Sequence, residues 1–145
     1  MVVIFVGPAI GADSSLIDQL EGAFIVAANG HFLGVVTTNS YNPKSILNEF
    51  GDYGNEYSDD SIFNEYGDYG GEYSEYSPFN EFTSTPPKIY TNDRKWAYLT
   101  VNEALSPRID PHWLIGALFT CTGLRIHVAN SYSECSSRRH PRPDR

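Results

Sequence analysis

Ser-Ile-Leu-Asn-Glu-Phe-Gly-Asp-Tyr-Gly, residues 45–54, recurs as Ser-Ile-Phe-Asn-Glu-Tyr-Gly-Asp-Tyr-Gly at residues 61–70. A shorter third copy, Ser-Pro-Phe-Asn-Glu-Phe, occupies residues 77–82. Successive copies begin 16 residues apart, so the middle of the chain is a tandem repeat of constant period. We interpret this repeat region, residues 45–82, as an insertion that is held at both ends by similar strand and turn elements.

The composition of the repeat predicts neither a long helix nor a regular sheet. Aromatic residues spaced by three and four, such as Phe50, Tyr53 and Tyr57, would suit one helical face, but each glycine between them would cost about 1 kcal/mol inside a helix. Strict alternation is absent as well. We therefore predict irregular turns in which glycine adopts a positive φ and rings lie across neighbouring copies. In particular, Tyr53, Tyr57, Tyr69 and Tyr73 should be buried against each other or against the preceding hairpin.

Strands are predicted on both sides of the repeat. Residues 23–28 and 31–38 are rich in Val, Ile and Phe and flank Asn29-Gly30, a strong signal for a β-hairpin. Residues 96–101, Trp-Ala-Tyr-Leu-Thr-Val, have high β-propensity, and residues 124–128 form a last strand candidate.

Two short helices complete the expected fold. Residues 13–21 carry apolar side chains at Leu16, Ile17 and Leu20, and residues 113–119 form an apolar run that begins near Asp110. The predicted fold class is therefore mainly β: one small domain, residues 13–130, with a β-hairpin, irregular Gly/Tyr-rich repeat turns and one or two short helices.

The repeat region is strongly acidic. Residues 45–87 contain ten Asp and Glu residues and no Lys or Arg, within a chain of net charge −8. This field repels polyphosphates, so no nucleic-acid partner is expected. Carboxylates, amide side chains and exposed turn carbonyls are the oxygen ligands that Ca²⁺ takes. The predicted calcium ligands are Asp52, Glu56, Asp59, Asp60, Asp68 and Glu72. The alternative is a solvated acidic face that only maintains solubility.

Catalytic motifs are missing from the sequence. It contains no nucleophile elbow, no zinc-protease motif and no phosphate-binding loop. His31 and His112, together with His127, lie near predicted element ends, which makes His31 and His112 the catalytic candidates if they converge with carboxylates. Structural histidines are the competing interpretation.

The two termini bear on the cellular compartment. Residues 1–12 are apolar and end in small residues, but no basic residue precedes the apolar run, so the segment fits either a degenerate export signal or a buried strand. Cys121 and Cys135 are either a disulfide pair or unrelated thiols. No apolar run is long enough for a membrane helix, and the Arg- and Pro-rich residues 131–145 are expected to be disordered.

The repeat pattern Asn-x-aromatic-Gly-x-Tyr-Gly-x-x-Tyr-Ser resembles an uncharacterised tandem-repeat module of bacterial proteins that are often predicted to be exported. The resemblance covers about residues 30–110 and implies a secreted or cell-envelope location, with a cytoplasmic one as the alternative. The leading hypothesis is a binding module for a protein, glycan or small-molecule ligand, with a Tyr and carboxylate surface that holds Ca²⁺. A Ca²⁺-dependent hydrolase of small esters or lactones and a purely structural repeat are the alternatives.

Overall fold

The computed structural model describes residues 14–122, with side chains described for residues 16–119. The predictions for residues 1–12, 124–128 and 131–145, for His127 and for the Cys121 and Cys135 side chains lie outside this description.

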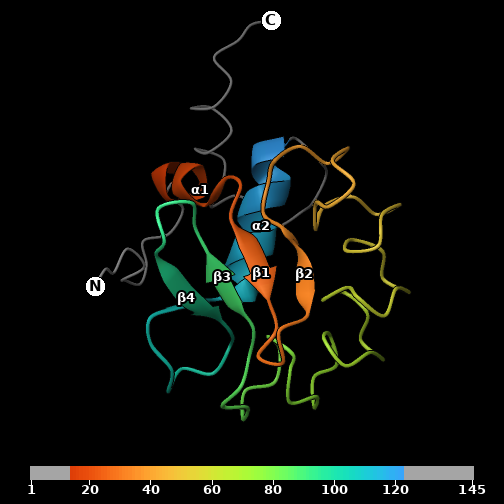
Figure 1. The fold of residues 1–145 in the computed structure, drawn as a ribbon, viewed down its shortest axis with the longest axis vertical. Helices are drawn as coiled ribbons and strands as arrows, with labels where there is room; N and C mark the ends of the chain where they lie inside the picture. Colours follow the sequence, from red (N-terminus) through yellow and green to blue (C-terminus); the bar gives the residue numbers. More distant parts are fainter. Residues whose placement is uncertain (1–13, 123–145) are drawn as a thin grey trace, which may run out of the picture.

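A mixed sheet of five strands forms the centre of the fold (Figure 1). The strands are β1 (Phe24–Val26), β2 (Phe32–Val35), β3 (Lys88–Tyr90), β4 (Trp96–Leu99) and β5 (Arg108–Ile109), in the spatial order β2-β1-β3-β4-β5. Neighbours pair antiparallel except β4 and β5, which are parallel. With two short helices, this architecture is consistent with the predicted mainly β class.

The predicted hairpin is confirmed. β1 and β2 pair antiparallel around a turn in which Gly30 has φ +92° and the Ala27 N–H donates to the carbonyl of His31. Glycine adopts this left-handed conformation without a steric penalty, which is why Asn29-Gly30 marks the turn. The strand predicted at residues 96–101 is β4.

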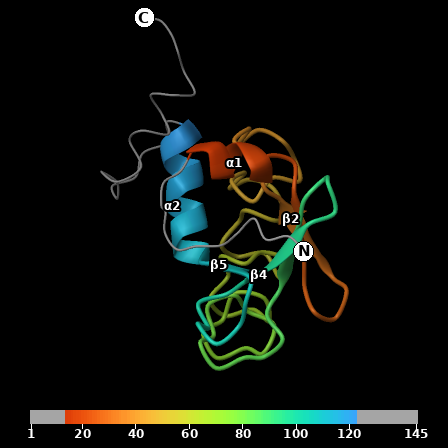
Figure 2. The ribbon, with the colours of Figure 1, turned by 90° about the vertical axis from the view of Figure 1, so that its left-hand side faces the viewer.

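Both predicted helices are present, as α1 (Ser14–Leu20) and α2 (Pro111–Thr122). Asp110 caps α2, because its Oδ1 accepts from the His112 N–H at 2.8 Å and its carbonyl accepts from Leu114 N–H at 3.0 Å. In the two perpendicular views, α2 covers one face of the sheet and α1 lies across one end of it (Figure 2).

The core lies between the sheet and α2. Ile25, Ile89 and Leu99 of the sheet are fully buried in one cluster with Leu114 and Leu118 of α2. Burying each such side chain contributes about 1.5–3 kcal/mol, so this layer holds the helix on the sheet. The aromatic side chains of the sheet alternate with these residues along the strands and therefore lie on the opposite face.

The repeat connects β2 to β3 and lies beyond the β2 edge of the sheet, as successive loops coloured yellow to green in Figure 1. Its first turn pairs with β2, since the Val35 N–H donates to the Lys44 carbonyl at 2.7 Å and Ile46 N–H donates to the Val35 carbonyl at 3.1 Å. Gly34 permits this approach, because a Cβ there would lie 2.8 Å from Ile46 Cγ2 and its φ is +116°. The repeat thus begins as an extension of the sheet edge.

Aliphatic side chains, rather than rings, are buried in the repeat. Ile46 and Ile62 are 1% and 0% exposed, whereas Tyr57 and Tyr73 are 80% and 83% exposed. The prediction that these two tyrosines are buried is therefore wrong. The prediction for the other two holds in part, because Tyr53 and Tyr69 are half-buried against the hairpin.

The repeat glycines serve close packing and not a left-handed conformation. Within the described residues the glycines of positive φ are Gly22, Gly30 and Gly34, so the predicted positive φ in the repeat is wrong. Instead, a Cβ on Gly54 or on Gly70 would lie 2.4 Å from a backbone carbonyl oxygen of its own repeat copy. Only a residue without Cβ fits at these two equivalent positions.

Candidate functional site

Three asparagines at equivalent positions of the repeat make the same two hydrogen bonds. The side-chain oxygen accepts from the backbone N–H two residues ahead, and the side-chain nitrogen donates to the backbone carbonyl six residues behind. These residues are Asn48, Asn64 and Asn80, with all six distances between 2.9 and 3.2 Å. Each asparagine thus closes a tight turn and also ties that turn to an earlier one.

The residue two positions after each of these asparagines is aromatic and faces solvent. We call these residues the first ring series: Phe50, Tyr66 and Phe82, which are 89%, 90% and 79% exposed. Their backbone N–H groups are held by the asparagine oxygens, which fixes the turn and leaves the side chain on its outside. Each ring of the first series therefore stands on a turn whose backbone is fixed by an asparagine.

A second series of exposed rings recurs with the same period of 16 residues. It consists of Tyr41, Tyr57 and Tyr73, which are 89%, 80% and 83% exposed. The same type of turn sets the first two, because Asn39 and Asn55 oxygens accept from the tyrosine N–H groups at 3.0 and 2.8 Å. The chain therefore exposes six rings at two repeated positions.

Nearly every exposed ring directly follows a carboxylate. Glu49, Glu65 and Glu81 precede the first ring series, and Glu56 and Glu72 precede the last two members of the second. All five glutamates are exposed. Hydrogen bonding to Glu56 and Glu72, together with the negative charge of these carboxylates, raises the pKa of Tyr57 and of Tyr73.

The two series meet at a hollow of about 600 Å³. Its lining includes four rings and two carboxylates: Phe63, Tyr66, Tyr73, Phe79, Glu65 and Glu72. His112, at the start of α2, also lines it and packs against Phe79 with ring centroids 5.2 Å apart. The hollow has the volume of a small-molecule site, and its walls combine ring faces with negative charge.

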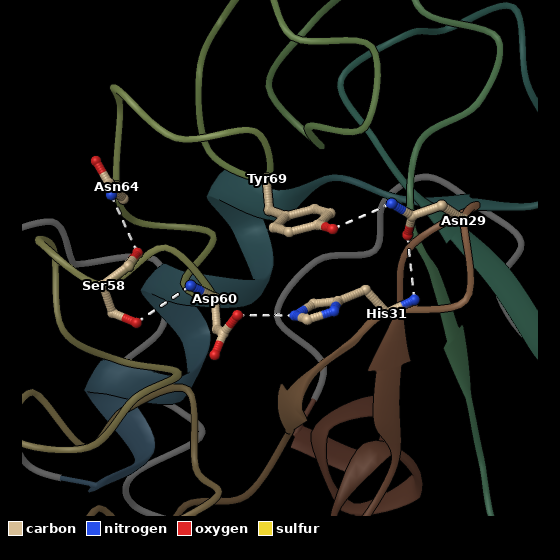
Figure 3. A network of polar contacts seen from close by, with 6 residues as sticks. All are labelled: Asn29, His31, Ser58, Asp60, Asn64 and Tyr69. Carbon is tan, nitrogen blue, oxygen red and sulfur yellow. Dashed lines mark hydrogen bonds and ion pairs between the residues drawn. The ribbon is translucent and has the colours of Figure 1, made fainter.

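A second group of polar residues joins the hairpin to the repeat (Figure 3). His31 Nε2 lies 2.8 Å from Asp60 Oδ1, and the imidazole stacks on Tyr69 with centroids 4.9 Å apart and planes 2° from parallel. Asn29 completes the group, since its Nδ2 donates to the Tyr69 hydroxyl at 3.1 Å and its Oδ1 accepts from the His31 N–H at 3.1 Å. These contacts hold the hairpin turn against the second copy.

The two catalytic candidates are in different environments. His31 contacts Asp60 and Tyr69, whereas His112 contacts Phe79. Among the side chains of residues 16–119, no serine or threonine hydroxyl is hydrogen-bonded to either imidazole. The His31 and Asp60 pair joins the hairpin to the repeat, and a catalytic role for His31 or His112 stays a prediction.

The predicted calcium ligands are not gathered. Asp60 pairs with His31, and Asp52, Glu56, Asp59, Asp68 and Glu72 are exposed. In the described part of the chain, no three Asp, Glu, His or Cys side chains lie close enough together to hold a metal ion. Ca²⁺ also takes backbone carbonyl and amide oxygens as ligands, so calcium binding by these residues stays a prediction.

Comparisons with protein-family models, with curated proteins and with solved structures find no match for this chain. Among the described residues, no helix has the length and apolar character needed to cross a membrane. The geometry of the repeat surface therefore carries the functional argument.

The sequence contained a signal for the ring series that the turn prediction did not use. Asn-Glu-aromatic occurs at residues 48–50, 55–57, 64–66 and 80–82. Asparagine forms a local turn by accepting from the N–H two residues ahead, so this tripeptide predicts an outward aromatic residue. The hollow could not be predicted from the sequence, because one of its walls is His112 of α2, which packs against Phe79 of the repeat.

Proposed function

We propose that this chain is a binding module whose two ring series form the ligand-contacting surface. The observation that carries the proposal is the exposure of six aromatic side chains, at 79–90%, at two positions that recur with the period of the repeat. Treating residues 45–82 as one tandem binding unit is part of this proposal.

The exposure of several large apolar rings to water needs an explanation. Single exposed apolar residues are ordinary, but rings that recur with the period of a repeat, two of them (Tyr66 and Tyr73) at a hollow, indicate an interaction site. Tyrosine and phenylalanine suit this role because a rigid ring gives a large contact area with little loss of side-chain freedom. The rings of the sheet differ, because they contact each other: Phe24 stacks on Tyr90 at 5.7 Å, and Trp96 meets Tyr98 edge-on at 5.3 Å.

The support of the ring series suggests a surface formed before the ligand arrives. Hydrogen bonds hold the backbone at each ring of the first series, and the aliphatic residues beneath, such as Ile62, are buried. A surface of this kind loses little entropy when it binds a ligand. A ligand that spans more than one repeat copy contacts additional rings after its position is already fixed by the first, so each further contact loses little orientational entropy.

A retention assay tests the proposal. The full chain would be passed over immobilised chitin, cellulose, poly-L-lysine and poly-L-glutamate, and compared with Tyr66→Leu/Tyr73→Leu. The matched control Tyr66→Phe/Tyr73→Phe keeps both rings and removes only the hydroxyl groups. We expect retention by at least one polymer, loss of retention in the leucine variant and near-normal retention in the control. Passage of the unmodified chain through all four matrices would contradict the proposal.

Three predictions from the sequence stay separate from this proposal. Calcium binding is tested by a melting curve in millimolar Ca²⁺ against Mg²⁺, where a dedicated site predicts a larger shift with Ca²⁺. Hydrolysis is tested with chromogenic esters. A secreted or cell-envelope location, which rests on the repeat resemblance, is tested by fractionation of a producing cell.

A further inference from the structure

We propose that the repeat surface binds an extended polypeptide rich in Arg or Lys, with each basic side chain lying on an exposed ring and its charged head at the neighbouring carboxylate. This inference rests on the proposed binding function and adds the chemical class of the ligand.

The pairing of ring and carboxylate is the first reason. At five of the six exposed rings the preceding residue is glutamate, and all five of these carboxylates are exposed beside their rings. Lys and Arg side chains have an apolar stem and a cationic head, so they match a ring face with a carboxylate beside it. A neutral ligand would use the ring face and leave the carboxylate without a partner.

The missing counter-charge is the second reason. Residues 45–87 contain ten carboxylates and no Lys or Arg, and among the described residues Asp60 is the single member of this group in an ion pair. Around the hollow, Glu65 and Glu72 are both exposed beside Tyr66 and Tyr73. The surface therefore offers unpaired negative charge at the places where the rings are exposed.

The sheet contains a contact of this type, between a lysine and aromatic rings of the same chain. Lys88 Nζ lies 4.5 Å from the centre of the Trp96 ring and 5.4 Å from the centre of the Tyr98 ring. This distance is within the range in which a cation is attracted by an aromatic face. The ring series present comparable faces, and the residues of the repeat supply no cation to occupy them.

Charge also argues against the other occupants. A second copy of this chain would bring its own net charge of −8 and a carboxylate beside each ring, so two such surfaces repel each other. An anionic polymer is repelled in the same way. A neutral glycan is compatible with ring stacking, and its binding is therefore one of the outcomes that the experiment must detect.

Fluorescence anisotropy with defined probes tests the inference. The full chain would be titrated against a labelled dodeca-arginine peptide, a dodeca-glutamate peptide and a labelled cellohexaose. The variants are Tyr66→Leu/Tyr73→Leu, which removes two rings, and Glu72→Gln, which removes one charge beside a ring. Glu103→Gln is the matched control, because Glu103 is an exposed glutamate outside the repeat. Thermal melts verify that each variant remains folded.

We expect the arginine peptide to bind, the glutamate peptide not to bind, and added salt to weaken the complex. Loss of the two rings should weaken binding about tenfold, which is the combined effect of two surface cation–π contacts. Glu72→Gln should weaken binding more than Glu103→Gln. Equal effects of the two glutamine variants, with no effect of the leucine pair, would show unspecific charge attraction and overturn the inference. Binding of cellohexaose without the arginine peptide would overturn it and leave the proposed function standing. Binding of no probe would overturn the inference, and the retention assay on the four immobilised polymers would still decide the proposed function.

Discussion

The asparagines that organise the repeat predict a graded loss of stability. In Asn64→Ala, the Tyr66 N–H and the Ser58 carbonyl lose partners at 3.0 and 3.1 Å. Each hydrogen bond contributes about 1 kcal/mol, so the free energy of unfolding should fall by about 2 kcal/mol. Asn64 is 7% exposed, so water does not readily replace the lost partners. Asn55→Ala is the comparison, because Asn55 makes one such bond, at 2.8 Å, and should lose about 1 kcal/mol.

Urea unfolding followed by circular dichroism measures these differences. A third variant, Asn64→Asp, keeps the acceptor for the Tyr66 N–H but replaces the donor with a carboxylate oxygen facing the Ser58 carbonyl. Asn64→Asp should therefore lower the free energy of unfolding by about 1 kcal/mol or more, because the hydrogen bond to the Ser58 carbonyl is lost and two oxygens face each other. A free energy of unfolding for Asn64→Ala equal to that of Asn55→Ala, within about 0.3 kcal/mol, would refute the two-bond account.

The close packing and the hairpin contact give two further predictions. Gly70→Ala should destabilise the fold by about 3 kcal/mol in thermal melts, because its Cβ would lie 2.4 Å from a backbone oxygen. The Cβ of Gly67→Ala would come no closer than 3.2 Å to the Asn64 side chain, which a small shift relieves, so this variant should lose less than about 1 kcal/mol. Equal costs would contradict this. Asp60→Asn should lower the free energy of unfolding by at most about 1 kcal/mol, because it removes the exposed ion pair with His31. Asp59→Asn should have no such effect. A larger loss of stability in Asp59→Asn than in Asp60→Asn would contradict a stabilising role for the His31 contact.

The hairpin and the helices were predictable because their signals are local. Asn29-Gly30 sets the backbone of the turn, and Asp110 supplies the cap at the start of α2. β3 and β5 were missed, since they contain three and two residues and the pattern of so short a strand carries little information. β3 also follows Pro86-Pro87, which signals a break.

The direction of the rings was not predicted because two local preferences compete. Aromatic residues are usually buried, and this tendency led to the expectation that Tyr57 and Tyr73 pack inside the repeat. At Tyr57, the turn formed by Asn55 decides the outcome, because its oxygen holds the Tyr57 N–H. Small side chains and aliphatic ones such as Ile62 then fill the interior.

The candidate site was predictable in composition but not in arrangement. The sequence indicated a surface of tyrosine and carboxylate, and Glu72 was among the named residues. The calcium ligands were chosen by the oxygen-rich composition of the repeat, and composition does not show whether carboxylates lie close together: Asp60 pairs with His31, and the other five are exposed. His112 was considered for catalysis, but it lies against Phe79 at the edge of the hollow.

Nuclear magnetic resonance of the aromatic side chains tests the central claim most directly. During titration of the full chain with the dodeca-arginine peptide, the rings that contact the ligand should change chemical shift. The account predicts saturable shifts for Tyr57, Tyr66 and Tyr73, and unchanged positions for Tyr90 in the sheet. Shifts confined to the sheet tyrosines, or no shift in the three exposed tyrosines, would contradict the claim that the repeat presents its rings as a binding surface.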